Sequence, residues 1–204
     1  MTHGQLTNRY ARQILDAARQ VIGPEAWARA LEGAGLERYR EQLPPASPEP
    51  GVTFAEISAF CQRIREQGGP EGGRILRQIG HQVFRRDLEA YGWVANLIRL
   101  VTGFLQAPGD RVYNALQRGA NVVRLETGSA PHVWREGSRF YWENPSCPYC
   151  VGIPCAEPCC DLPAGVLEAL VAWVLERPVE AVRVIEESCR GGGAGACRYR
   201  IEWQ

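Results

Sequence analysis

Seven cysteines within residues 147–197 are the feature that most limits how this chain can fold. Apolar packing alone does not produce such a density of thiols, so this segment requires sulfur chemistry. Soft thiolate sulfurs bind zinc, usually as four ligands in a tetrahedron. The segment therefore predicts a metal site, and the alternative is a set of buried or disulfide-paired cysteines. The seven are Cys147, Cys150, Cys155, Cys159, Cys160, Cys189 and Cys197.

The spacing of these cysteines suggests how their sulfurs converge. Cys147 and Cys150 are separated by two residues, which lets both sulfurs of one turn reach the same ion. Cys189 and Cys197 flank a glycine-rich segment that we expect to be a hairpin connection, bringing Cys197 back beside Cys189. The eighth cysteine, Cys61, lies alone on a predicted helix and is assigned no role.

Composition excludes several classes of function. The 204 residues carry 23 basic and 23 acidic side chains, so no net charge attracts the chain to nucleic acid or to an anionic membrane. The chain has no lysine, which excludes Schiff-base chemistry and a phosphate-loop lysine. The N-terminus lacks a signal-peptide pattern, and no apolar run reaches the ~20 residues of a membrane span. We expect a cytoplasmic protein, in which thiols stay reduced and bind metal.

Hydrophobic periodicity predicts an α+β fold, with N-terminal helices followed by an antiparallel sheet that one helix interrupts. Helical spacing indicates helices at 5–21, 25–42, 53–66, 76–91, 93–104, 108–119 and 165–176. A period of two indicates strands at 122–126, 132–135, 139–143, 179–186 and 198–203. Thr53 and Glu56 form a capping-box pattern at the start of the third helix.

A proline-rich segment at residues 44–50 predicts a boundary between two parts. Residues 1–50 are expected to be an N-terminal helical extension, and residues 51–204 the main domain. The helix at 5–21 carries an apolar stripe that a separate extension cannot easily bury, so we predict a homodimer. The alternative is that the extension folds back on the main domain.

Five residues in the C-terminal part follow a recognisable pattern. A cysteine lies five residues before a glycine that begins a helix. A strand then ends in Glu-x2-Cys and is followed by a glycine-rich turn and a last cysteine. These residues are Cys160, Gly165, Glu186, Cys189 and Cys197. The pattern resembles that of the 4-vinyl-reductase domain family.

This resemblance implies a fold shared with the sensor domains of phenol- and xylene-responsive activators, and more remotely with the TRAPP-like NO-signalling and Golgi-transport fold. It also implies structural zinc bound by Cys160, Glu186, Cys189 and Cys197. The segment between Cys160 and Glu186 is longer here than in the activators, so Cys155 or Cys159 is an alternative to Cys160. Cys147, Cys150, Cys155 and Cys159 exceed the family pattern as candidate ligands. A second metal or an iron–sulfur cluster is therefore an alternative.

The resulting hypothesis is a zinc-containing sensory domain that binds a small apolar or aromatic ligand between the helices and the sheet. The alternative is a 4-vinyl reductase acting on a tetrapyrrole, but the sequence shows no pair of catalytic residues. A near-match to a dinucleotide fingerprint at residues 191–196 is rejected because a strand, not a helix, follows it. The predicted ligand pocket contains His81, Phe84, Trp93, Leu97, Trp134, Phe140, Tyr141 and Trp142, for which ordinary core positions are the alternative.

Overall fold

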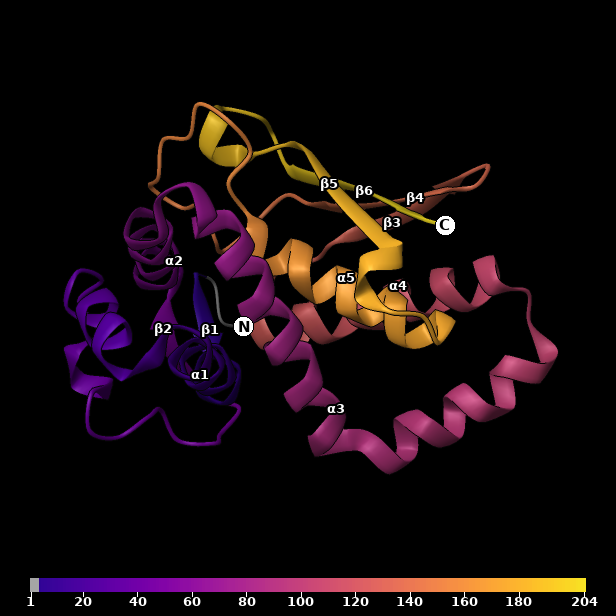
Figure 1. Cartoon of the computed structure of the whole chain (residues 1–204), viewed down its shortest axis with the longest axis horizontal. Helices are drawn as coiled ribbons and strands as arrows, with labels where there is room; N and C mark the ends of the chain where they lie inside the picture. Colours follow the sequence, from indigo (N-terminus) through magenta and orange to yellow (C-terminus); the bar gives the residue numbers. More distant parts are fainter. Residues whose placement is uncertain (1–3) are drawn as a thin grey trace.

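The computed structural model describes residues 4–204, apart from the side chains of residues 90–105. It has an α+β fold in which helices pack beside an antiparallel sheet (Figure 1). The helices are α1 (Asn8–Glu32), α2 (Phe54–Gly68), α3 (Gly72–Leu105), α4 (Pro108–Thr127) and α5 (Asp161–Leu175). The strands are β1 (Gln5–Thr7), β2 (Pro50–Thr53), β3 (His132–Glu136), β4 (Arg139–Asn144), β5 (Val182–Ser188) and β6 (Cys197–Trp203). The predicted α+β class is therefore confirmed.

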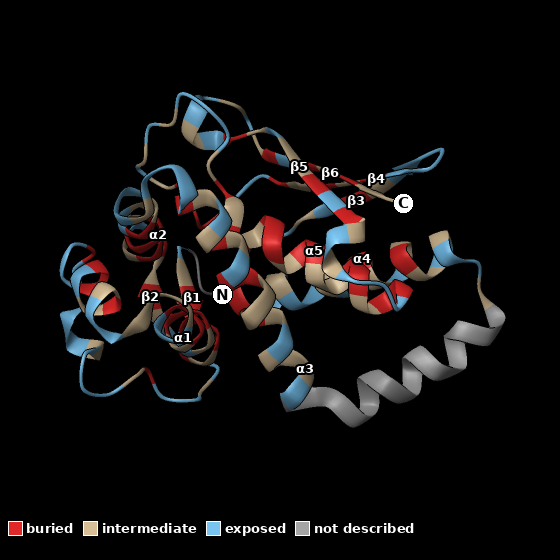
Figure 2. Ribbon diagram, in the orientation of Figure 1, coloured by how far each residue is buried: buried red, intermediate tan, exposed pale blue. Residues whose placement is uncertain are grey.

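The main sheet has the strand order β3-β4-β6-β5, and every neighbouring pair is antiparallel. Side chains alternate along β4 and β6, so Phe140 and Trp142 lie on the same buried face as Tyr199 and Ile201. This face packs toward α4 and α5, and Figure 2 shows buried residues on both sides of the contact. The alternation predicted for the last strand is confirmed.

The N-terminal residues belong to the same core as the rest of the described chain. Strand β1 pairs with β2, and Leu6 lies opposite Val52. Ile14 and Leu15 of α1 are completely buried, and α1 contacts α2 and α3. Residues 4–50 therefore have no separate core. The argument for a homodimer does not hold, because the apolar stripe of α1 is covered within one chain.

Helix α1 includes the sharp bend that the sequence marked as its end. Gly23 has φ 77° and ψ 165°, and Pro24 follows it inside the element. The predicted helices at 5–21 and 25–42 are thus two arms of α1, and the second arm ends at Glu32. The prediction of two separate helices at 76–91 and 93–104 is wrong, since α3 continues as one helix from Gly72 to Leu105.

The strand predicted at residues 122–126 is wrong, because these residues form the last turns of α4. Their apolar side chains suggested a buried strand, but Val122 is 47% exposed and Leu125 is 61% exposed. Gly128 ends the helix in the left-handed conformation, with φ 70°, and its N–H bonds the Arg124 carbonyl oxygen. Helical hydrogen bonding therefore prevails over the local β propensity of these residues.

Two glycines allow α3 and α5 to touch along their backbones. A Cβ atom added at Gly80 would lie 2.2 Å from the Leu162 carbonyl oxygen, and one at Gly165 would lie 2.2 Å from the Arg77 carbonyl oxygen. Only glycine permits so close an approach. The contact fixes the start of α5, directly after Cys160. Within the described residues, no helix is long and apolar enough to cross a membrane.

Candidate metal centre

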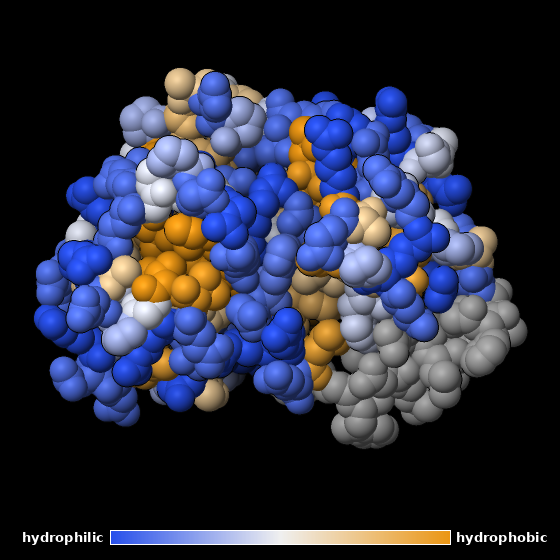
Figure 3. All heavy atoms as spheres, viewed as in Figure 1, coloured by the Kyte–Doolittle hydropathy of each residue, from blue (hydrophilic) through white to orange (hydrophobic). Residues whose placement is uncertain are grey.

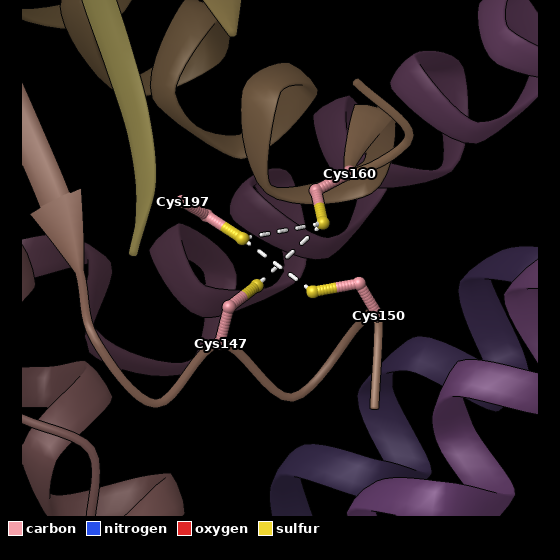
Figure 4. A group of neighbouring side chains, drawn as sticks. All are labelled: Cys147, Cys150, Cys160 and Cys197. Atoms are coloured by element: carbon pink, nitrogen blue, oxygen red, sulfur yellow. Dashed lines mark hydrogen bonds between the residues drawn. The ribbon is translucent and has the colours of Figure 1, made fainter. Parts of the chain in front are cut away.

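Four buried cysteines point their sulfurs toward one another (Figure 4). Cys147 and Cys150 lie on the loop after β4, Cys160 caps the N-terminus of α5, and Cys197 opens β6. All four sulfurs lie within 4.8 Å of one another, and each residue is at most 3% exposed. We call this group the thiol quartet.

The sulfur–sulfur distances in the thiol quartet match the edges of a metal–thiolate tetrahedron. The measured distances are 3.7 Å for Cys147 to Cys160, 3.5 Å for Cys150 to Cys197 and 3.8 Å for Cys160 to Cys197. A tetrahedral ion with metal–sulfur bonds of about 2.3 Å has sulfur–sulfur edges of about 3.8 Å. The quartet could therefore hold one ion with little rearrangement.

The four ligands implied by the sequence are also brought together. The ligand atoms of Cys160, Glu186, Cys189 and Cys197 lie within 4.8 Å of one another, so this second set shares two members with the thiol quartet. The Cys189 sulfur lies 3.7 Å from that of Cys160 and 3.9 Å from that of Cys197. Glu186 accepts a hydrogen bond of 2.7 Å from the Cys160 backbone N–H through Oε2.

Cys155 and Cys159 form a disulfide in this structure, and their role as additional or alternative ligands of the reduced chain stays a prediction. The Cys159 sulfur still lies 3.7 Å from the Cys189 sulfur, at the rim of the cluster. Cys160, and not Cys155 or Cys159, takes part in both four-ligand sets. Cys61 is buried on α2, and burial raises the pKa of its thiol to about 12.

The glycine-rich turn has the predicted role of returning Cys197 to Cys189. Gly193 adopts φ 90°, which a residue with a side chain rarely accepts. Gly191 packs against the cysteine loop: an added Cβ atom would lie 2.6 Å from the Cys155 sulfur, and the Gly191 carbonyl oxygen accepts a 3.1 Å hydrogen bond from the Cys155 N–H. The turn therefore holds the two cysteine segments together through backbone contacts.

Hydrogen bonds among the sulfurs distribute the protons unevenly. Hydrogen bonds with neighbouring sulfurs, of which the one with Cys147 has the largest effect, lower the pKa of the Cys150 thiol. Those around Cys160, again led by Cys147, raise the pKa of its thiol. The contact with Cys150 raises the pKa of Cys189, but hydrogen bonds with Cys160 and Cys197 outweigh it and bring the pKa down to about 6. Without a cation, a buried cluster accommodates few negative charges, whereas a bound metal displaces the thiol protons.

Charged side chains anchor α5, and hence Cys160, to the neighbouring helices. Asp161 forms ion pairs with Arg65 of α2 and with Arg77 of α3, the latter at 3.0 Å. Arg65 also donates to the Cys159 carbonyl oxygen at 2.7 Å. These partly buried, charge-assisted bonds are stronger than neutral ones and fix where the cysteine segment joins the helix.

The N-terminal helix also reaches the cysteine loop. The hydroxyl groups of Tyr10 on α1 and Tyr149, between Cys147 and Cys150, are 3.0 Å apart and share a hydrogen bond. Both tyrosines are buried, and burial raises the pKa of each hydroxyl. Sequence reasoning missed this contact because the two tyrosines are 139 residues apart.

The residues predicted to form a ligand pocket do not share one surface. Phe140 and Trp142 are buried toward the helices, whereas Trp134 and Tyr141 stack on the other face of the sheet with ring centroids 5.0 Å apart. Phe84 packs edge-on against Trp173 at 6.1 Å. Trp93 and Leu97 lie outside the described side chains. His81 lies with its Nε2 atom 3.0 Å from the Glu168 Oε2 atom, between α3 and α5.

Among the described residues, two of the open hollows have polar walls. One of about 380 Å³ is lined by Arg77, Asp161, Arg183 and Glu186 together with apolar neighbours, and one of about 340 Å³ lies around His81, Gln78 and Arg85. The face in Figure 3 is largely hydrophilic, with smaller hydrophobic areas over the N-terminal helices and beside the sheet. Neither hollow has the apolar lining that was expected for the ligand pocket.

Solved structures with this arrangement of elements identify the fold. The matches include an H-NOX protein from S. oneidensis in the Fe(II)NO ligation state, with 14% identity, TM-score 0.57 and coverage of 95% of this chain and 98% of that one. A mutant of the T. tengcongensis H-NOX is 13% identical, with TM-score 0.61 and 98% of each chain covered. The fold is that of H-NOX domains.

A third match is an oxygen-binding H-NOX domain related to soluble guanylate cyclases, with 16% identity, TM-score 0.56 and coverage of 94% of this chain and 92% of that one. The sequence itself matches no protein-family model and no curated protein. At these identities the H-NOX likeness is a statement about fold.

The H-NOX fold overturns the resemblance to the 4-vinyl-reductase family. With it fall the zinc-containing hydrocarbon-binding domain and the reductase alternative. Zinc as the cofactor that the family implied, and the iron–sulfur cluster that the additional cysteines left open, are also overturned, because heme is the group named for the structural neighbours. The five-residue pattern was too short to specify a family, since thiol spacing constrains a local turn and not the order of the helices and strands along the chain.

Proposed function

We propose that this chain is a sensor domain with the H-NOX fold, in which the thiol quartet holds one soft, sulfur-preferring metal ion. The observation that carries the proposal is the convergence of four buried sulfurs at tetrahedral spacing. The ion would supply positive charge that keeps all four thiols deprotonated.

With the ion bound, the four ligands would cross-link three segments of the chain. Cys147 and Cys150 lie on the loop after β4, Cys160 at the start of α5, and Cys197 at the start of β6. Four protein ligands leave no open position for a substrate, so this arrangement favours a structural or regulatory role over catalysis. A change at the metal would alter how α5 docks on the sheet.

Heme, which is named for proteins with this fold, fits poorly among the described residues. Among the described residues, only His81 and His132 could offer an imidazole to its iron, but His81 contacts Glu168, and His132 is exposed and stacks on Trp134. The direct backbone contact of α3 with α5 at Gly80 and Gly165 also leaves no room between the two helices at that point. We therefore assign no step to heme.

The proposal includes a small-molecule stimulus. Proteins with this fold include an oxygen-binding domain and one with NO on its iron, so a small ligand is consistent with the architecture. A homodimer, a cytoplasmic location and a remote relation to the TRAPP-like fold stay predictions that rest on the sequence alone.

Cobalt titration of the reduced full-length chain tests the metal site. We expect one or more equivalents of Co²⁺ to bind with intense sulfur-to-cobalt charge-transfer absorption and a tetrahedral visible spectrum. The Cys147→Ser/Cys150→Ser variant should lose the four-thiolate spectrum, and Cys61→Ser, which changes a buried cysteine outside the cluster, should retain it. Absence of the spectrum in the parent protein would overturn the proposal.

A parallel hemin titration tests the second candidate, a heme-binding gas sensor, which the fold likeness favours. We expect only weak, nonspecific absorption changes. A stoichiometric complex with a sharp Soret band, lost on His81→Ala, would support heme at His81, whereas the cobalt titration tests the thiol quartet separately.

A further inference from the structure

We propose that the cluster is a binuclear site, in which the sulfurs of Cys160 and Cys197 bridge two soft divalent metal ions. The inference rests on the proposed function, because the second ion shares two ligands with the first. It adds Glu186 and Cys189 as the outer ligands of the second ion.

Two complete ligand sets lie side by side in the structure. The first is the thiol quartet, and the second consists of Cys160, Glu186, Cys189 and Cys197. Together they supply six donor residues, two more than one tetrahedral thiolate site uses. Because Cys160 and Cys197 belong to both sets, two ions can each have four ligands only if these two sulfurs are shared.

The second set has the spacing of a metal site in its own right. The sulfurs of Cys160, Cys189 and Cys197 form a nearly equilateral triangle with sides of 3.7, 3.9 and 3.8 Å. This matches one face of a tetrahedron with edges of about 3.8 Å. The Glu186 carboxylate supplies the fourth corner.

Glu186 provides an independent observation. Its Oε2 atom accepts the Cys160 N–H, but its Oε1 atom is buried and has no hydrogen-bond partner in the described part of the chain. Burying an unpaired carboxylate oxygen is costly, and a cation beside it removes that cost. The next residue, Glu187, differs: it is exposed and forms an ion pair with Arg200 at 2.6 Å.

Charge also favours a second ion. Five thiolates and one carboxylate would carry six negative charges in a largely buried cluster. One divalent ion would leave four of these charges uncompensated, whereas two divalent ions would leave two. A second ion beside Glu186 and Cys189 therefore reduces the net negative charge that the buried cluster has to hold.

Titration with ¹¹³Cd²⁺ followed by NMR distinguishes the outcomes. The full-length chain is reduced with a phosphine and titrated with the metal alone. We expect two equivalents to bind and to give two signals of equal intensity, one from a four-sulfur site and one shifted upfield by an oxygen ligand. Scalar coupling between the two cadmium nuclei would report the shared sulfurs. A single equivalent would overturn the binuclear site and leave the proposed function intact, and no binding would overturn both.

A pair of neighbouring substitutions tests the role of Glu186. Glu186→Gln should weaken binding of the second equivalent by about tenfold or more and leave the first signal in place. The matched control Glu187→Gln should bind both equivalents. Cys189→Ser gives a second version of the test, with the same loss expected at the second site only.

The rim cysteines offer a competing location, since Cys155, Cys159 and Cys189 also lie within 4.8 Å of one another. The Cys155→Ser/Cys159→Ser variant should therefore still bind two equivalents with the coupling preserved. Loss of the second signal in this variant would place the second ion at the rim and overturn bridging by Cys160 and Cys197.

Discussion

Replacing Gly165 with alanine should destabilise the protein, although the same change normally strengthens a helix. The added Cβ atom would lie 2.2 Å from the Arg77 carbonyl oxygen and 2.7 Å from the Arg77 Cα atom. Ordinary contacts of this kind are longer than 3 Å, so α5 and α3 would have to separate. Because these are backbone atoms, no side-chain rotation can relieve the overlap.

The expected magnitude follows from two opposing effects. Glycine to alanine in a helix gains about 1 kcal/mol in helix propensity. Overpacking a close-packed contact costs about 1–3 kcal/mol and occasionally more, and an overlap with backbone belongs at the upper end. We therefore expect Gly165→Ala to lower the free energy of unfolding by about 2 kcal/mol, or the melting temperature by about 4–8 °C for a chain of this size.

Urea denaturation of both proteins under identical metal loading measures the effect. Gly119→Ala on α4 is the matched control, because its Cβ atom would meet only side-chain atoms, the nearest being Leu170 Cδ2 at 3.4 Å. It should stabilise the protein by about 0.5–1 kcal/mol. Since Cys160 caps α5, Gly165→Ala should also weaken cobalt binding. Unchanged or increased stability of Gly165→Ala would refute the direct helix contact.

Two further predictions concern buried charges. Burial raises the pKa of Asp87 to about 6, so this group stabilises the fold below its unfolded pKa of about 4 and the contribution is lost as the pH rises through 6. Asp87→Asn should therefore increase the free energy of unfolding near pH 7.5 by at most about 3 kcal/mol and have little effect near pH 4. An equal gain at both pH values would contradict this explanation. Asp161→Asn should cost about 1–3 kcal/mol in urea denaturation, because Arg65 and Arg77 lose a shared carboxylate. The exposed-pair control Glu71→Gln should change stability by less than about 0.5 kcal/mol, and equal effects of the two variants would contradict a special role for Asp161.

Local features could be predicted from the sequence because their causes are local. The capping box at Thr53 and Glu56 is present: Glu56 Oε2 accepts the Thr53 N–H at 2.8 Å, and Thr53 Oγ1 accepts the Glu56 N–H at 3.2 Å. The alternation in β6 and the return of Cys197 to Cys189 through the glycine turn are also confirmed. Each depends on residues within a single turn, strand or hairpin.

Predictions failed where a distant partner decides the outcome. The residues 122–126 have strand-like composition, but they form the end of α4, where Val122 and Leu125 face solvent. The apolar stripe of the N-terminal helix appeared to need a second copy of the chain, but α2 and α3 cover it, and the homodimer itself stays a prediction. In both cases the local pattern is compatible with two structures, and packing selects one.

The sequence by itself determined that residues 147–197 concentrate thiols and that Cys189 and Cys197 meet across a turn. Tertiary structure alone decided which sulfurs share a site. The pairing of β4 with β6 places Asn144 opposite Cys197, which brings Cys147 and Cys150 to the start of β6. Docking of α5 on α3 then adds Cys160. Strand register and helix docking arise from packing over the whole core, so cysteine spacing along the chain could not specify them.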